Sequence, residues 1–248
     1  MNRVLLITGG GRGIGAATAL LAAQQGYIVA VNYAANATAA TEVVRQIKAA
    51  GGAAVAIAAD VADEAQVLSM FAQIDAQFGR LDALVNSAGV VDTTQRLDEQ
   101  DLARWRRLFE INVYGTLLCC REAVRRMSTR HGGQGGAIVN LSSVAAVLGG
   151  SGQYVDYAAS KGAIDSLTVG LAREVAAEGV RVNAVRPGII DTEIHASGGQ
   201  PGRAQRLAPQ IPMQRAGTAQ EVAQAIVWLL SDAASYTTGS ILDAAGGR

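Results

Sequence analysis

The sequence predicts an α/β protein with a Rossmann-type doubly wound parallel sheet of about seven strands and helices on both faces. Short β-branched runs alternate with segments of helical periodicity along the chain, which is typical of a parallel sheet covered on both sides. The first run leads directly into a glycine-rich turn that opens a helix. Half of the 248 residues are hydrophobic and only 17% are charged, so the chain can form one large core.

The alternation assigns every predicted element. Strands are predicted at Val4–Thr8, Ile28–Asn32, Ala53–Ala58, Leu81–Asn86, Ala137–Leu141, Val180–Val185 and Ser240–Leu242. Helices are predicted at about 13–25, 37–50, 63–77, 99–127, 154–178 and 218–231. No linker or repeat divides the chain, so we expect a single domain over residues 1–248. The segment at about 191–217 is too long for an ordinary connection, and we predict a substrate lid there.

Composition argues against several classes of partner. With 21 basic and 21 acidic residues the net charge is zero, so no overall field attracts nucleic acid or an anionic membrane. Cys119 and Cys120 are adjacent and match neither a metal site nor a disulfide framework, so we expect them to pack in a helix. The apolar run from Val4 to Ile7 is too short for a signal sequence, and no stretch reaches the length of a membrane span. We expect a cytoplasmic protein without a metal.

The glycine-rich turn covers residues 8–15, with the sequence Thr-Gly-Gly-Gly-Arg-Gly-Ile-Gly. Glycines let the backbone turn sharply and approach a ligand closely. A helix N-terminus offers unpaired N–H groups and the positive end of its dipole to a phosphate. The glycines at 9, 13 and 15 do not follow the familiar G-x-G-x-x-G spacing. We interpret the turn as a cradle for a dinucleotide pyrophosphate, against the alternative of a tight connection without a ligand.

The end of the second predicted strand bears on which dinucleotide binds. An NAD site commonly has an acidic residue there, which holds the ribose hydroxyls. Here Asn32 and Tyr33 stand in a stretch without a carboxylate, and Arg12 lies in the glycine turn. The missing carboxylate removes repulsion from a 2′-phosphate, and Arg12 adds attraction. We therefore favour NADP(H), and NAD(H) stays open.

Tyr157 and Lys161 are four residues apart in a predicted helix, so they share one face, with about 5–6 Å between their Cβ atoms. A free tyrosine titrates near pH 10, and a neighbouring cation lowers its pKa by stabilising the phenolate. Lowering that pKa by about three units takes roughly 4 kcal/mol, which one charge pair supplies only in a partly closed site. The pair predicts a proton carrier in such a site. A surface Tyr and Lys that share a face by chance are the alternative.

Together these motifs resemble the short-chain dehydrogenase/reductase family over essentially the whole chain. Asp60-Val61 resembles its adenine-contacting pair, and residues 86–89 resemble its Asn-Asn-Ala-Gly motif, with Ser87 as a departure. The segments Gln153–Lys161 and His195–Gly202 are most similar to bacterial members described as sugar-dehydrogenase-like. The resemblance implies these cofactor contacts: Gly9, Gly11, Arg12, Gly13, Ile14, Gly15, Asn32, Tyr33, Asp60, Val61, Asn86, Ala88, Gly89, Tyr157, Lys161, Pro187, Gly188, Ile190 and Thr192.

The resemblance also implies a reaction, in which a hydride passes between nicotinamide and a carbonyl or secondary alcohol. In that reaction Tyr157 is the general acid or base, and Ser143 hydrogen-bonds the reacting oxygen. Lys161 lowers the pKa of the phenol and binds the nicotinamide ribose, and Asn112 holds a water that connects Lys161 to solvent. These four residues are the predicted catalytic set.

Several of these assignments have alternatives. Ser143 precedes Tyr157 by 14 residues, one more than is usual in the family, so Ser142 competes with it and the loop between is expected to carry an insertion. We prefer Ser143, because it begins the loop beyond the strand. Asn86 either contacts the cofactor or ties neighbouring strands together. Asn112 either holds the relay water or kinks or caps its helix. We expect His131 and Asp156 to be solvated. His195 lies in the predicted lid, where a substrate contact stays open, and we give it no catalytic role.

The function also has competing interpretations. A nucleotide-sensing binding protein without turnover would be expected to lack the Tyr–Lys pair, which this chain has. Within the enzymes, a sugar dehydrogenase and a 3-oxoacyl-[acyl-carrier-protein] reductase compete. The second is weakened by Glu178, which stands where a basic docking residue is expected, although Arg125, Arg126 and Arg130 are near. We expect a small-molecule substrate and, from the family, a homo-oligomer packed through the helices at 99–127 and 154–178.

Overall fold

A parallel sheet of seven strands forms the centre of the computed structural model, which describes residues 3–248. The strand order is β3-β2-β1-β4-β5-β6-β7, and every neighbouring pair is parallel. The predicted doubly wound fold is therefore confirmed. The strands are β1 (Val4–Thr8), β2 (Ile28–Tyr33), β3 (Ala53–Ala58), β4 (Ala83–Asn86), β5 (Gly136–Leu141), β6 (Val180–Pro187) and β7 (Ile241–Ala244).

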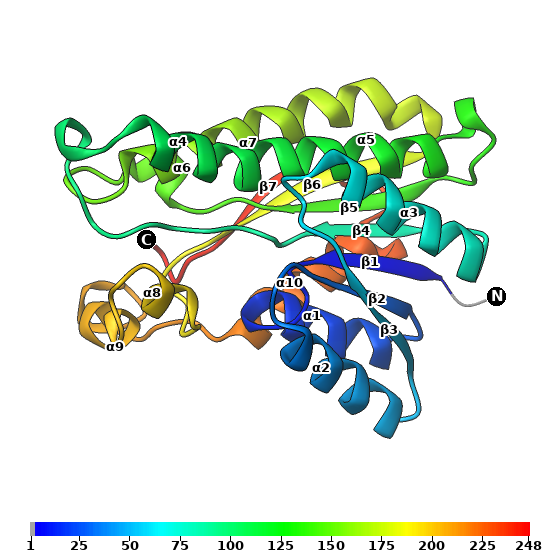
Figure 1. Cartoon of the computed structure of the whole chain (residues 1–248), viewed down its shortest axis with the longest axis horizontal. Helices are drawn as coiled ribbons and strands as arrows, with labels where there is room; N and C mark the ends of the chain where they lie inside the picture. Colours follow the sequence, from blue (N-terminus) through cyan, green and yellow to red (C-terminus); the bar gives the residue numbers. More distant parts are fainter. Residues whose placement is uncertain (1–2) are drawn as a thin grey trace.

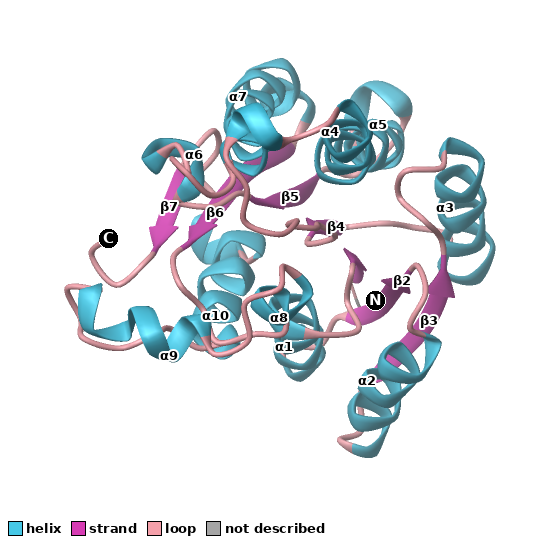
Figure 2. Ribbon diagram, turned by 60° about the vertical axis from the view of Figure 1, so that its left-hand side comes forward, coloured by secondary structure: helices cyan, strands magenta, loops and turns pink. Residues whose placement is uncertain are grey.

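Helices cover both faces of the sheet (Figures 1 and 2). One face carries α1 (Gly13–Gln24), α2 (Ala37–Ala49) and α10 (Ala219–Leu230), and the other carries α3 (Glu64–Phe78), α5 (Gly115–Met127) and α7 (Val155–Val175). Alternate strand residues divide between the two cores, because successive side chains of a strand point to opposite faces. Leu5 and Ile7 pack in the first core, and Val4 and Leu6 in the second. Cys119 and Cys120 are both buried in the second core, as expected.

The long helix predicted at 99–127 is interrupted in the structure. It is divided into α4 (Leu102–Phe109), a π-helical turn (Glu110–Tyr114) and α5. Asn112 lies inside that turn and is hydrogen-bonded through its side chain to both backbone groups of Val90. A widened turn of this kind often marks a functional site, because it re-aims a side chain out of the regular helix. A π-helical turn at Asn112 therefore interrupts the predicted helix, and the roles that the sequence left open for Asn112 stay predictions.

The predicted lid contains two short helices, α8 (Ile194–Ser197) and α9 (Arg203–Leu207), and a 3₁₀ turn (Ala208–Gln210). Its two ends are tied together: the Asp191 N–H donates to the Gly217 carbonyl, and the Gly217 N–H donates to the Ile189 carbonyl, each at 2.9 Å. The segment lies beyond the carboxyl end of β6 (Figure 1). A further short helix, α6 (Ala145–Leu148), occupies the loop between Ser143 and Tyr157, where the sequence predicted an insertion. Among residues 3–248, no helix combines the length and the hydrophobicity needed to cross a bilayer.

The expectation that Asp156 is solvated was wrong. Its side chain is 2% exposed, and its carboxylate accepts hydrogen bonds from the buried guanidinium of Arg104 at 2.6 and 3.3 Å. The same guanidinium donates to the Thr93 carbonyl and to Gln95 Oε1. Helical periodicity correctly separated Asp156 from the face of Tyr157, but α4 packs against that second face and excludes water from it. The ion pair thereby fixes the start of α7, next to Tyr157.

We predict that Asp156→Asn destabilises the protein by about 3 kcal/mol, because it leaves the Arg104 charge buried without its anionic partner. Urea unfolding followed by circular dichroism measures the loss. The matched control is Asp98→Asn, which breaks the exposed pair with Arg96 and should change the unfolding midpoint very little. Equal midpoints for the two variants would contradict this account of the buried pair.

Candidate active site

The glycine turn places a row of free backbone N–H groups at the carboxyl end of β1. The first hydrogen bond of α1 runs from the Ala16 N–H to the Arg12 carbonyl, at 3.1 Å. Within residues 3–248, the N–H groups of residues 11–15 have no hydrogen-bond acceptor. Free N–H groups at a helix start are suited to bind an anion such as a pyrophosphate. The turn therefore fits the phosphate cradle that the sequence predicts.

Close packing explains two of the glycines. Gly9 has φ of +62°, and a Cβ there would lie 2.9 Å from the Ala88 Cα. A Cβ on Gly15 would lie 2.4 Å from the Gly9 carbonyl oxygen. The Thr8 hydroxyl accepts hydrogen bonds from the N–H groups of Ser87 and Ala88, each at 3.1 Å. These contacts hold the turn after β1 against the loop after β4, so both motifs border one cleft.

The residues at the end of β2 differ in their exposure. Asn32 is buried: its amide donates to the carbonyls of Ile57 and Ala59, and its Oδ1 accepts from the Gly9 N–H. It therefore joins β2 to β3 and to the glycine turn, and has a structural task whether or not it touches a cofactor. Tyr33 is partly buried, and Arg12 is exposed. The Arg12 side chain has no hydrogen bond or ion pair within the described chain, so its charge is free to meet a ligand.

The predicted cofactor contacts Asp60 and Asn86 also form hydrogen bonds within the protein. Asp60 accepts a hydrogen bond from the Ala62 N–H at 3.0 Å, in the turn that follows β3, and Val61 packs against Gly115. Asn86 donates to Asn140 Oδ1 at 2.9 Å and so ties β4 to β5, the structural role that the sequence left open. Its own Oδ1 is buried without a partner among residues 3–248.

Asn112, Gly89 and Lys161 meet beside the cleft. The Asn112 amide donates to the Ser160 hydroxyl at 3.2 Å, in addition to its two bonds with Val90. A Cβ on Gly89 would lie 3.4 Å from Asn112 Oδ1 and 3.7 Å from Lys161 Nζ. Three segments that are distant in the sequence therefore converge on the lysine ammonium, as the predicted catalytic set requires.

Tyr157 and Lys161 share a face of α7, with Lys161 Nζ 5.7 Å from the centre of the Tyr157 ring. The ammonium donates to the Leu141 carbonyl at 2.7 Å. The predicted lowering of the phenol pKa is absent in this structure. Burial raises the pKa of Tyr157 to about 12, although the nearby Ser143 hydroxyl favours the phenolate. Burial also lowers the pKa of Lys161 to about 8, so the loss of water weakens the charge that was expected to stabilise the phenolate.

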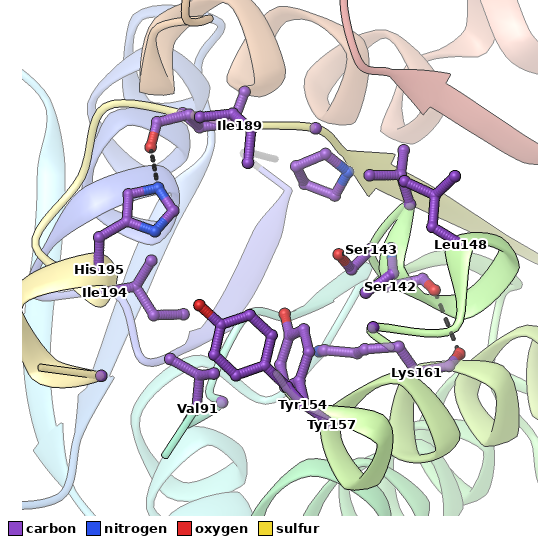
Figure 3. A pocket seen from close by; sticks show the side chains of 18 of the residues that line it. Val91, Ser142, Ser143, Leu148, Tyr154, Tyr157, Lys161, Ile189, Ile194 and His195 are labelled. Carbon is purple, nitrogen blue, oxygen red and sulfur yellow. Dashed lines mark hydrogen bonds between the residues drawn. The ribbon is translucent and has the colours of Figure 1, made fainter. Parts of the chain in front are cut away.

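The structure separates the two candidate serines. The Ser142 hydroxyl is buried and donates to the Lys161 carbonyl at 3.2 Å. Ser143 is partly exposed, and its hydroxyl accepts from the Ala145 N–H while facing the two tyrosine hydroxyls in Figure 3. The Ser143 hydroxyl proton is therefore free to point toward a bound oxygen, and the choice of Ser143 stays a prediction.

These groups line one cavity of about 400 Å³. Its wall includes Ile14, Gly89, Ser143, Tyr157, Lys161, Pro187, Gly188, Ile190 and Thr192 from the predicted set. The lid contributes Ile194, His195 and Arg203, so the predicted lid does border the site. The Nε2 of His195 lies 2.9 Å from the Ile190 carbonyl, and burial lowers the pKa of His195. His131 is exposed and distant from this wall, as expected.

Other lining residues were missed, among them Tyr154, the N-cap residue of α7, and Arg203, which begins α9. The spacing of three between Tyr154 and Tyr157 was a usable signal, since it would put both on one face of the predicted helix 154–178. Arg203 gave no such signal, because its position depends on how the lid folds back. Gln153 and Arg248 also border the cavity, from the start of α7 and from the residue at position 248.

A comparison with protein-family models assigns the chain. Residues 9–248 match the model described as enoyl-(acyl carrier protein) reductase, adh_short_C2. A short-chain dehydrogenase/reductase of Serratia marcescens, solved as a double mutant, is similar with a TM-score of 0.91 and 36% identity over 99% of this chain and 97% of that one. The chain is a short-chain dehydrogenase/reductase. It is an NAD(P)-dependent oxidoreductase for carbonyl or alcohol substrates, and the resemblance noted from its motifs is confirmed at the level of the family.

Two relatives of this short-chain dehydrogenase/reductase extend the comparison. The uncharacterized oxidoreductase YgfF of Escherichia coli is 60% identical over 245 residues, which are 99% of this chain and 99% of YgfF. The cis-4-hydroxycyclohexanecarboxylate dehydrogenase of Sinomonas cyclohexanicum is 41% identical over 246 residues, 99% of this chain and 96% of that enzyme. The similarity to sugar-dehydrogenase-like members stays a prediction.

We predict that Gly9→Ala weakens dinucleotide binding and lowers the melting temperature, because the Cβ meets the backbone of Ala88. Gly26→Ala is the matched control: Gly26 also has positive φ, at +86°, but a Cβ there meets nothing within 4 Å. Both variants carry the left-handed strain of about 1–2 kcal/mol. Only Gly9→Ala should also lose binding of NAD(P)H, measured by its fluorescence. Retained binding in that variant would exclude this contact as the reason for the glycine.

Proposed function

We propose that this short-chain dehydrogenase/reductase transfers a hydride between NADP(H) and a carbonyl or secondary alcohol, with Tyr157 as general acid or base. One observation carries the proposal: the Tyr157 hydroxyl, the Ser143 hydroxyl and the Lys161 ammonium border a single cavity that adjoins the glycine turn. Such a site brings a proton donor, a hydrogen bond for the reacting oxygen and a cation together. A binding protein without turnover has no use for this set.

The dinucleotide fits the residues at the carboxyl edge of the sheet. The free N–H groups of residues 11–15 would hold its pyrophosphate, and Asp60 with Val61 would border its adenine. Pro187, Gly188 and Thr192 lie in the cavity wall, where they would border the nicotinamide. The nicotinamide supplies or accepts the hydride when it is bound. Membership of the family therefore implies an NAD(P) cofactor for this chain, and the orientation of the cofactor described here is our proposal.

The protein's own part in the reaction is to hold and move one proton. With its pKa raised to about 12, Tyr157 keeps its proton at neutral pH, which is the form that donates during carbonyl reduction. Ser143 would donate a hydrogen bond to the same oxygen as it gains negative charge. Lys161, beside Gly89 and Asn112, would return a proton toward the phenol, with a water held by Asn112 connecting it to solvent.

The preference for NADP(H) rests on charge. No carboxylate stands at the end of β2, where the Asn36 side chain instead accepts from the Ala39 N–H and caps α2. The Arg12 guanidinium, in the glycine turn, is exposed and has no partner among residues 3–248. A 2′-phosphate would meet an unpaired cation and no fixed negative charge. NAD(H) is the alternative cofactor that the binding test below addresses.

An acyl-carrier-protein substrate is the second candidate, favoured by the description of the matching family model. The basic cluster that could dock an acidic carrier is neutralised within the chain. Arg125 and Arg126 pair with Glu122, and Arg130 lies 3.9 Å from Glu178. We therefore prefer a small-molecule substrate.

We also propose a homo-oligomer in the cytoplasm. Of the apolar side chains along α4 and α5, Leu108 and Val113 are buried within the chain. Leu117 and its neighbour Tyr114 are exposed, on the face that the family uses between subunits. Burying these side chains in an interface would remove apolar surface from water.

Tyr157→Phe should lower turnover by about 10²–10⁴-fold while leaving dinucleotide binding nearly unchanged, because it removes only the proton donor. A panel of ketones, aldehydes and sugars, screened with NADPH and NADH by nicotinamide absorbance, first supplies a substrate. Tyr236→Phe is the matched control, since Tyr236 is fully exposed and remote from the cavity wall. Comparable turnover in Tyr157→Phe and wild type would remove Tyr157 from the reaction.

For Arg12→Ala we expect the Kd of NADPH to rise about 10–100-fold, and that of NADH to change less than about threefold, because only NADPH has the 2′-phosphate. Isothermal titration calorimetry on the whole chain measures both. Arg106→Ala removes another exposed arginine, in the last turn of α4, and should change neither Kd. Equal losses for NADPH and NADH would overturn the cofactor preference.

A further inference from the structure

The cavity has an unbalanced charge. Lys161, Arg203 and Arg248 border it, and no Asp or Glu does so among the described residues. Lys161 is already used beside Tyr157, in the proposed reaction. Arg203 and Arg248 are the two further cations, and Arg248 is one of the charges that lower the pKa of Arg203. The wall therefore has cationic side chains and no carboxylate side chain among the described residues.

Arg203 is well enclosed. It is the first residue of α9 and is 9% exposed, and its guanidinium lies 4.9 Å from the centre of the Tyr154 ring. Its N–H groups donate to the Tyr154 hydroxyl, to Gln200 Oε1 at 3.0 Å and to Gln153 Oε1 at 2.9 Å. A guanidinium has five N–H donors, so these three acceptors leave two without a partner in the described chain. All three acceptors are neutral.

Comparison with a second enclosed arginine of this chain shows that Arg203 lacks an anionic partner. Arg104 is similarly buried, and its charge is matched by the carboxylate of Asp156 at 2.6 Å. Arg203 has only hydroxyl and amide oxygens, and burial lowers its pKa while Arg206 and Arg248 lower it further. A buried charge is costly unless an opposite charge or a ligand satisfies it. This unsatisfied cation borders a cavity large enough for a small molecule.

A latch for the lid is the competing explanation, because Arg203 joins α9 to the start of α7. Such a latch needs only the hydrogen bonds to Gln153 and Tyr154, which a neutral side chain could also supply. It does not account for a positive charge without a counter-charge, or for a second cation, Arg248, at the same cavity.

We propose that Arg203, seated on the Tyr154 ring, binds a carboxylate of the substrate, so that the enzyme acts on an oxo acid or the corresponding hydroxy acid. This inference rests on the proposed function, in which the same cavity holds the reacting carbonyl. A carboxylate would accept the free N–H groups of Arg203 in charge-assisted hydrogen bonds. Val91, Leu148 and Ile194 supply an apolar wall for the carbon skeleton between the two polar ends.

The spacing of the two tyrosines limits where the carboxylate stands on that skeleton. Tyr154 is the N-cap residue of α7 and Tyr157 lies three positions further along, so the two side chains are separate points on the cavity wall. Figure 3 shows both hydroxyl groups toward the cavity. A carbonyl at Tyr157 and a carboxylate above Tyr154 are then separated by several bonds. A 2-oxo acid, whose carboxylate is bonded directly to its carbonyl carbon, does not satisfy this spacing.

The test compares acids with their own neutral esters. 4-Oxocyclohexanecarboxylate, 4-oxopentanoate and their ethyl esters are the probes, and pyruvate is the short control acid. We expect wild-type kcat/KM with NADPH to be about 10–100-fold higher for the longer acids than for their esters. Arg203→Met should abolish most of this acid-to-ester preference, and Arg203→Lys should restore part of it. Arg173→Met, which alters an exposed arginine of α7 outside the cavity wall, should preserve the preference.

Calorimetric binding of the acids and esters to the full chain supplies a second measurement, which does not depend on turnover. Acid binding that is lost in Arg203→Met, without any turnover in wild type, would support the carboxylate site and contradict the proposed reaction. Turnover of the esters or of neutral sugars at least as fast as of the acids would overturn the carboxylate site and leave the oxidoreductase intact. An equal loss of binding or turnover for acid and ester in Arg203→Met would identify a lid latch and would also overturn the carboxylate site.

Discussion

The active site depends on the meeting of the carboxyl ends of β1 and β4 at the place where the strand order reverses. From β1 the chain passes outward to β2 and β3, and it then returns to form β4 on the other side of β1. The connections that follow β1 and β4 lead to helices on opposite faces of the sheet, and ligands of such folds bind in the crevice at this reversal. Thr8 bonds the two loops together, and Gly9 lets their backbones approach. Every predicted motif of the site is placed relative to this crevice.

Exclusion of water governs the electrostatics of that crevice. Burial raises the pKa of Tyr157 and lowers that of Lys161, so both groups are biased toward their neutral forms. An isolated pair of side chains on a helix would behave in the opposite way, with the ammonium favouring the phenolate. The site as it stands holds a proton on the phenol. A protonated phenol is the form that can donate to a carbonyl oxygen.

The two buried arginines differ in whether the protein itself supplies an opposite charge, and this difference separates a role in stability from a role in ligand binding. Arg104 pairs with Asp156 and joins α4 to α7, so its charge is balanced within the fold. Arg203 meets only neutral acceptors on the lid side of the cavity. A charge satisfied by the protein contributes to the scaffold, while one left unsatisfied beside a cavity indicates what the cavity binds. The substrate class that we propose follows from that contrast.

Much of this protein was determined by its sequence. Alternating apolar runs and periodic segments suffice to predict a parallel sheet covered on both faces. A glycine turn between a strand and a helix suffices to predict free N–H groups. Both are local consequences of the backbone. The strands that the sequence predicted agree with the structure to within two residues at each end. β5 ends at Leu141, so both Ser142 and Ser143 lie beyond the strand, and the choice of Ser143 stays a prediction.

Only the tertiary structure decided the properties that depend on which surfaces meet. The burial of Asp156 required α4 to cover its face, and the interruption at Asn112 required Val90 from a distant loop. The pKa values of Tyr157 and Lys161 depend on how completely neighbouring segments exclude water, which no spacing of residues encodes. Arg203 borders the cavity because α9 packs against Gln153 and Tyr154, at the start of α7. Burial and charge pairing are properties of contacts between remote segments, and they arise only when the chain is folded.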